Sequence, residues 1–223
     1  GAGLEHLRLL PHVEQSITDL DGSLTPWLLR ALRALLTERK VRCREHGVRS
    51  VDEWRERKMS GAEPTPPPPR VVIVADEVNA LAEQNPDLME ELVSVCRQGR
   101  SLGLHLVAAA QRAGGAISAQ MRSVLDLRVA LRCAEVPDSI DAVGSAAAAR
   151  LPKGPGRAIV GDTAAQLAYV AEPERLVAML RDLGDEGPPA LAKPLPTSVT
   201  VAELYRLQKA NVNNGQTGKM TMR

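Results

Sequence analysis

The stretch that decides the fold is RVVIVADEV, Arg70–Val78. Its apolar run, Val71–Ala75, predicts a buried β-strand. Two carboxylates, Asp76 and Glu77, follow this strand directly. Because burying a carboxylate is costly, we expect the pair either at the open end of the strand or in contact with a cation.

Helix and strand signals alternate on both sides of this stretch. Amphipathic spacing predicts helices at 23–47, 50–58, 86–99, 116–124 and 173–184, and another short helix after a loop at 134–139. Apolar runs predict strands at 104–112 and 125–133, a Gly/Pro turn and a strand within 151–160, a hairpin partner at 164–172, and a short strand at Ser16–Leu20. The alternation predicts an α/β fold with a mostly parallel sheet flanked by helices, in which ligands bind at the carboxyl ends of the strands.

The composition divides the chain into three parts. Residues 1–185 carry the α/β pattern, while residues 186–198 are rich in proline and predict a linker. Residues 199–223 predict a short helix followed by a polar tail. A second proline-rich stretch, Gly61–Arg70, predicts a stiff connector that leads into the strand Val71–Ala75.

The overall composition also narrows the classes of function. Hydrophobic residues make up 44% of the 223, and 28 basic side chains balance 27 acidic ones. This near-neutral charge gives no overall attraction to nucleic acid or membranes, and the lack of phenylalanine nearly excludes aromatic stacking on bases. Three scattered cysteines form no disulfide or metal-binding pattern, which favours a reducing cytosol. No apolar run is long enough to cross a bilayer, and no signal peptide is visible.

An apolar strand that ends in Asp-Glu is the Walker B pattern of nucleotide hydrolases. There the aspartate holds Mg²⁺ and the glutamate orients or deprotonates the attacking water, roles that fall here on Asp76 and Glu77. The alternative is a strand followed by an ordinary acidic turn. The next strand, 104–112, ends in Gln111, and a parallel neighbour would place that amide beside Glu77. Gln111 could then bond a γ-phosphate oxygen or the attacking water, or it could be a polar strand end in solvent.

The predicted strand at 125–133 carries two arginines on one face. Arg128 and Arg132 alternate with apolar residues at a period of two. One interpretation is an arginine that reaches the nucleotide of a neighbouring subunit. The other is a solvated or salt-bridged edge whose acidic partners would be Asp126, Glu135 or Asp138.

Several segments resemble one family in register. They are LPHVEQSITDLDG at 10–22, GRSLGLHLVAAAQR at 99–112, and the region from LDLRVALR to PGRAIV at 125–160. Together they resemble the FtsK/SpoIIIE family of hexameric motor ATPases, and most of all its EccC-like branch, the motor of type VII secretion. The resemblance covers about Gly1–Pro173. Ala113, where DNA-pumping members often carry proline, also leans toward the secretion branch.

The resemblance implies a P-loop NTPase (RecA-like) domain that uses ATP and Mg²⁺. Asp76 matches the Mg²⁺ residue, Glu77 the catalytic glutamate, Gln111 the sensor and Arg128 the intersubunit arginine, whereas Arg132 has no such match. It further implies a hexameric ring of the chain with itself that moves a secreted protein. The ring would lie at the cytoplasmic face of the bacterial inner membrane, attached through segments outside this chain.

The phosphate-binding loop of such ATPases is missing from the expected place. The only near match, NNGQTGKMT at 213–221, has Asn213 in place of the first glycine and Met220 in place of the Mg²⁺-binding hydroxyl residue. We therefore expect the chain to start after the Walker A segment, with the N-terminal part of the fold absent, and not to turn over ATP alone. Two alternatives stay open: a DNA translocase for chromosome or plasmid transfer, and a non-catalytic scaffold within such an assembly. Retention of both Asp76 and Glu77 speaks against the scaffold.

Overall fold

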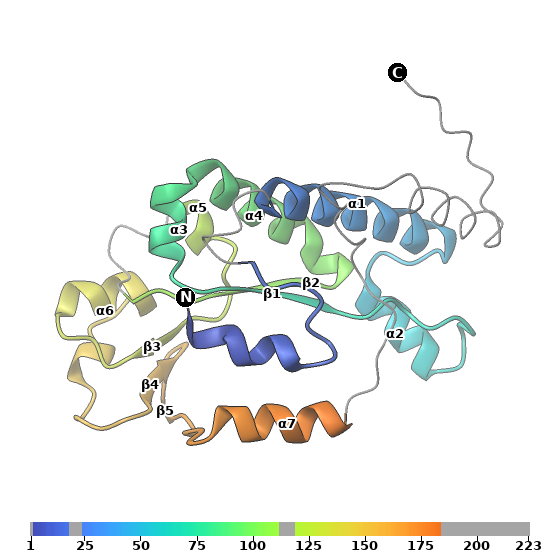
Figure 1. Cartoon of the computed structure of the whole chain (residues 1–223). Helices are drawn as coiled ribbons and strands as arrows, with labels where there is room; N and C mark the ends of the chain where they lie inside the picture. The colour runs from blue at the N-terminus through green and yellow to red at the C-terminus, as the bar shows by residue number, and fades with distance from the viewer. Residues whose placement is uncertain (1, 18–23, 112–118, 184–223) are drawn as a thin grey trace, which may run out of the picture. The chain divides into compact units, whose positions relative to one another are not determined.

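The computed structural model describes residues 2–17, 24–111 and 119–183 (Figure 1). The predicted linker, the predicted tail, the loop-like stretch at 213–221 and Ala113 lie outside these ranges. All described residues belong to one compact unit, Gly1–Ala192. The α-helices are α1 (Leu24–Glu45), α2 (Val51–Met59), α3 (Val78–Gln84), α4 (Pro86–Gly99), α5 (Ala119–Arg122), α6 (Val136–Val143) and α7 (Pro173–Leu183). The 3-10 helices are η1 (Ala2–Leu9), η2 (Arg100–Leu102) and η3 (Ala148–Arg150).

The described strands form two separate sheets. β1 (Val71–Ala75) and β2 (Leu104–Ala108) pair in parallel, with Val71 opposite Leu104 and Ala75 opposite Ala108. β3 (Val129–Leu131), β4 (Arg157–Val160) and β5 (Thr163–Gln166) form an antiparallel sheet in that order. The α/β fold and the pairing of β4 with β5 are confirmed, although β5 ends at Gln166, short of the predicted strand 164–172. The parallel arrangement holds for β1 and β2 only, because β3 pairs antiparallel with β4.

One face of the parallel pair rests on the main core. α1 contributes Leu32, Leu35 and Leu36 to this core, and α4 contributes Met89, Leu92, Val93 and Cys96. These side chains pack against Leu104 and Ala75 and against the half-buried Ile73 and Leu106. Figure 1 shows α1 and α4 on the same side of β1 and β2. The strands are thereby fixed against a two-helix layer.

The opposite face of the parallel pair is open. Val72, Val74 and Val107 are 57%, 52% and 51% exposed, and Val74 lies directly opposite Val107 in the register. Strands of a parallel sheet are ordinarily covered on both faces. Among the described strands, β1 and β2 therefore present an apolar surface to solvent.

Arg39 joins the starting ends of the two parallel strands. Its guanidinium is almost fully buried, at 1% exposed, and donates from Nη1 to the Leu102 carbonyl and from Nη2 to the Pro69 carbonyl, each at 2.6 Å. Pro69 and Leu102 lie just before β1 and β2. Gly103, at φ 75°, follows Leu102, and a Cβ atom there would stand 3.2 Å from Arg39 Nη1. Glycine is therefore needed where the chain passes the guanidinium.

Some boundaries differ from the sequence-based expectation. Ser16 and Ile17 belong to no strand, so the described part of the predicted strand Ser16–Leu20 is wrong; residues 18–20 lie outside the described ranges. α6 starts at Val136, inside the predicted loop 134–139, because Pro137 suits the first turn of a helix. α3 begins at once after Glu77, where no helix was predicted.

Candidate functional site

The carboxyl ends of β1 and β2 lie level with each other. The hydrogen bonding between these two segments continues beyond the strands, because the Ala109 N–H donates to the Ala75 carbonyl at 2.9 Å. The Val78 N–H in turn donates to the Ala109 carbonyl at 3.0 Å. The residues that follow the two strands are therefore held side by side, as expected at the ligand-binding edge of a parallel sheet.

This arrangement brings Gln111 to Glu77. Gln111 Nε2 donates a hydrogen bond to Glu77 Oε1 at 3.1 Å, although the two residues lie 34 positions apart in the sequence. Both side chains are exposed. The predicted proximity of Gln111 and Glu77 is thus observed, and the amide contributes no charge that would compete with a bound cation.

Asp76 is fixed by the adjacent backbone. Its Oδ1 accepts a hydrogen bond from the Glu77 N–H at 3.0 Å, and its Oδ2 forms no hydrogen bond within the described ranges. An exposed carboxylate with one free oxygen fits Mg²⁺, which binds through one or two carboxylates together with waters and substrate phosphates. Within the described residues no group of three or more His, Cys, Asp or Glu could hold a metal ion unaided. The donor set therefore fits a magnesium–nucleotide complex better than an all-protein metal site.

Glu77 has an unusual backbone. Its φ and ψ are 51° and 48°, and it is the only non-glycine residue with positive φ in the described part of the chain. It also precedes the first residue of α3 without capping that helix through its side chain. The apolar spacing of Val78, Leu81 and Ala82 could have indicated α3, but nothing in the local sequence indicates the left-handed backbone.

The two arginines of the third strand differ in their contacts. Arg128 and Arg132 flank β3. Arg132 Nε donates to the Leu151 carbonyl at 3.2 Å, so its guanidinium is partly engaged within the chain. Arg128 is exposed and forms no ion pair with any described residue. The acidic partner considered for it, Asp126, instead pairs with Arg100 at 2.5 Å.

Arg128 is not brought to the carboxylates within one chain. It lies beside the antiparallel sheet, where its carbonyl accepts from the Gly161 N–H at 2.8 Å. No contact joins it to Asp76, Glu77 or Gln111 within the described residues. An exposed guanidinium of this kind remains available to an anion outside the chain.

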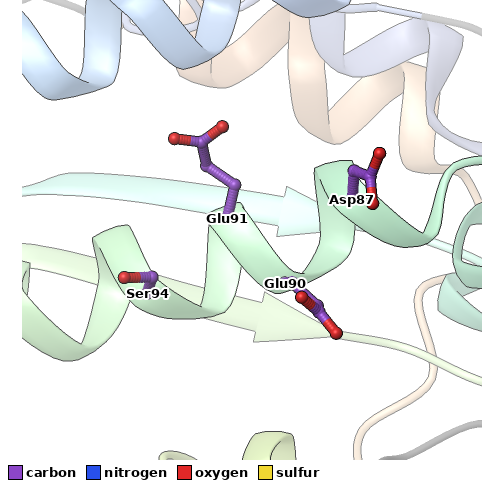
Figure 2. Close-up of a pocket in the computed structure, with 4 residues that line it drawn as sticks. All are labelled: Asp87, Glu90, Glu91 and Ser94. Atoms are coloured by element: carbon purple, nitrogen blue, oxygen red, sulfur yellow. The ribbon is translucent and has the colours of Figure 1, made fainter.

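A separate acidic hollow lies on α4. It is lined by Asp87, Glu90, Glu91 and Ser94, and Figure 2 shows all four side chains on that helix. Glu91 forms an ion pair with Arg33 of α1. None of the residues at the ends of β1 and β2 lines it. We interpret the hollow as a solvated helix face and not as part of the site.

Comparison with known proteins identifies the family. No protein-family model matches the chain. The type VII secretion system protein EssC of Staphylococcus aureus is 35% identical over 159 residues, which cover 71% of this chain and 11% of EssC. The chain is a homologue of the EssC/EccC type VII secretion ATPases. The predicted resemblance to the EccC-like branch is therefore confirmed.

Solved structures of this family share the fold. The cytoplasmic domain of the Thermomonospora curvata type VII secretion ATPase EccC matches with a TM-score of 0.75 at 30% identity, covering 92% of this chain and 26% of that one. ATPases 2 and 3 of Thermomonospora curvata EccC, in complex with a signal sequence peptide, match with a TM-score of 0.73 at 22% identity, a likeness of fold alone. The fold is that of a P-loop ATPase domain. The chain spans about a tenth of the length of EssC, at 11%.

None of the described helices combines the length and the apolar character needed to cross a membrane.

Proposed function

We propose that this chain is the part of a type VII secretion motor that follows the phosphate-binding loop, and that it serves ATP hydrolysis. The observation that carries the proposal is the Gln111–Glu77 hydrogen bond, which lies beside Asp76 at the end of a parallel strand pair in a homologue of secretion ATPases. Acidic side chains and a neutral amide at this edge are what a magnesium–nucleotide complex requires.

Each residue at the edge has a distinct role in this proposal. Asp76, whose Oδ1 already accepts the Glu77 N–H, would hold the metal. Mg²⁺, when bound, neutralises phosphate charge and orients the triphosphate. Glu77 accepts the proton of the attacking water, which requires its carboxylate to be ionised and correctly aimed. A phosphate-binding loop is needed to complete this site.

The motor is proposed to act as a ring of subunits. Arg128, exposed and without an ion pair among the described residues, would contact the γ-phosphate bound by the neighbouring subunit. The proposed cargo is a protein, because a homologue of the same fold has been solved with a signal sequence peptide. Membrane attachment would come from other segments of the full-length protein.

Replacing Glu77 by glutamine tests the assignment. In the full-length protein, Glu77→Gln removes the proton acceptor and preserves the size of the side chain, so ATP affinity stays within about twofold and kcat falls by about 10²–10⁴-fold. Nucleotide binding and phosphate release measure the two effects. Glu83→Gln, an exposed glutamate on α3, is the matched control and retains activity.

Other outcomes would favour other functions. Hydrolysis stimulated by duplex DNA, with an affinity that falls steeply with salt, would indicate a DNA translocase. A wild-type protein that binds ATP without turning it over would indicate a scaffold. Equal hydrolysis by the wild type and Glu77→Gln would remove Glu77 from the mechanism.

A further inference from the structure

The backbone of Glu77 calls for a physical cause. The left-handed region is disfavoured for residues with a side chain, and glutamate has no local hydrogen bond that compensates as asparagine does. A single residue is kept there only where its surroundings over-determine its conformation. Glu77 is such a residue, and it is also the proposed catalytic glutamate.

Ala109 over-determines the conformation. Its N–H donates to the Ala75 carbonyl at 2.9 Å and its carbonyl accepts from the Val78 N–H at 3.0 Å. Two residues, Asp76 and Glu77, lie between these hydrogen bonds, where a regular parallel ladder has one, so the chain must bulge to hold the extra residue. Val78 is 1% exposed, so packing in the core fixes the position of this residue. Asp76 Oδ1 tightens the turn by accepting the Glu77 N–H.

The bend directs the Glu77 side chain toward the segment that produces the bend. Gln111 lies two residues beyond Ala109, and its Nε2 donates a hydrogen bond to Glu77 Oε1 at 3.1 Å. Oε2 of Glu77 has no hydrogen bond within the described part of the chain. The end of β2 therefore does two things: Ala109 bends the backbone of Glu77, and Gln111 holds one oxygen of its carboxylate.

We propose that Gln111 is a positioning residue that acts through Glu77, and does not itself bind the nucleotide. The inference rests on the proposed function. With Oε1 held, Oε2 accepts a proton from water, and the hydroxide oxygen bonds to the γ-phosphorus of ATP as the bond to the ADP oxygen breaks. A neutral amide holds the carboxylate oxygen without placing a positive charge beside it.

The backbone part is tested on the chain alone by comparing two substitutions that both remove the carboxylate. At an ordinary helical position alanine is more stable than glycine, whereas at a left-handed position glycine is more stable. The Tm of Glu77→Gly is therefore expected to exceed that of Glu77→Ala by about 2–4 °C. Glu90, exposed in the interior of α4, supplies the control pair, for which alanine is the more stable. Greater stability of Glu77→Ala would overturn the proposed strain.

The positioning part is tested in the full-length protein with Gln111→Leu, which keeps a side chain of similar bulk and removes the donor. Without this hydrogen bond the Glu77 carboxylate is no longer correctly oriented. We therefore expect kcat to fall by about 10–100-fold and the KM for ATP to stay within about twofold. In a Glu77→Gln background, Gln111→Leu is expected to cause no further loss of activity and no change in the Kd of ATPγS. A residue that touches the γ-phosphate would weaken ATPγS binding in both backgrounds.

The two proposals fail in different ways. A wild-type protein without ATPase activity would overturn the proposed function, and the positioning role with it. An active wild type in which the losses from Gln111→Leu and Glu77→Gln multiply would overturn only the positioning role. Weaker ATPγS binding by Gln111→Leu would do the same and would make Gln111 a ligand of the nucleotide.

Discussion

Arg39 shows how one side chain sets the spacing of the parallel strands at the end away from the site. A planar guanidinium can donate to two carbonyls at once, and here those carbonyls belong to the residues just before β1 and β2. Burial lowers the pKa of Arg39, because the charged form loses its hydration. Its Nε has no hydrogen-bond partner among the described residues. The strand separation therefore depends on a charge that is held by backbone oxygens.

Replacing Arg39 is expected to destabilise the chain. Arg39→Ala leaves the Leu102 and Pro69 carbonyls without their donor and opens a cavity, so the free energy of unfolding falls by about 2–4 kcal/mol. Arg39→Lys restores only part of the loss, because one ammonium cannot reproduce the two-pronged geometry. Urea unfolding measures both. Arg30→Ala, exposed on the same helix, is the control and stays within about 0.5 kcal/mol of the wild type; an equal loss there would refute the role of burial.

At this scale, the sequence predicts contacts better than conformations. The proximity of Gln111 and Glu77 followed from two neighbouring parallel strands that both end in polar residues. The left-handed backbone of Glu77 did not follow, because it is imposed by hydrogen bonds to Ala109, which is 32 positions away (109 − 77). The burial of Arg39 was equally hidden, since its partners are backbone carbonyls and backbone groups carry no sequence signal.

Among the elements, the connector Gly61–Arg70 is held more firmly than its lack of regular structure suggests. Trp54 of α2, fully buried, donates from Nε1 to the Thr65 carbonyl at 3.0 Å. Glu63 Oε1 accepts from the Thr65 N–H at 2.9 Å, and Glu63 Oε2 lies 3.1 Å from His46 Nδ1. These contacts fasten the connector to α2 and to His46, just after α1, and so fix where β1 begins.

The Glu63 contacts predict a pH dependence of stability. The Thr65 N–H, and then His46, lower the pKa of Glu63 below its ordinary value of 4.5. Between the two values the unfolded chain binds more protons than the folded one, so this stabilisation is complete above pH 4.5 and is lost as the pH falls through the lowered pKa.

Unfolding by urea between pH 3 and pH 7 measures the effect. Glu63→Gln is expected to lower stability at neutral pH and to reduce the slope of stability against pH in the acid range. Asp52 and Glu53 have pKa values lowered in the same direction, so some slope remains. Glu56→Gln, exposed on α2, controls for the loss of one negative charge. An unchanged slope in Glu63→Gln would contradict the assignment.

Element boundaries were predicted well where local chemistry sets them. The bounds of α4, Pro86–Gly99, match the prediction, because proline suits the first turn and the apolar spacing is regular. α3 was missed because it is only seven residues long. It also starts directly after the bent backbone of Glu77, and no side chain there caps the helix. The pairing of β3 with β4 depends on long-range contacts that period-two spacing cannot identify.

For the whole molecule, the proposal predicts that ATP hydrolysis depends on contact between subunits. Arg128 should act only between subunits, so Arg128→Ala lowers hydrolysis by on the order of 10³-fold in the assembled full-length protein and leaves the residual activity of separated monomers unchanged. Arg132→Ala, whose side chain is engaged with the Leu151 carbonyl, is the matched control with a smaller effect.

Mixing two inactive variants provides a sharper measurement. When Arg128→Ala and Glu77→Gln subunits assemble together, some interfaces combine an intact Arg128 with an intact Glu77. Partial recovery of phosphate release is therefore expected, rising and falling with the mixing ratio. A mixture as inactive as its components, or an equal loss of activity in monomers, would show that Arg128 does not act across an interface.

The open valine face of β1 and β2 also bears on how the chain behaves as a solute. Val72, Val74 and Val107 form an apolar patch on this face, with His105 beside it opposite Val72. Contact between two such faces would remove hydrocarbon from water without unfolding either molecule. Colloidal stability and folding stability are therefore separate properties of this chain, and a concentrated solution can precipitate in the native state.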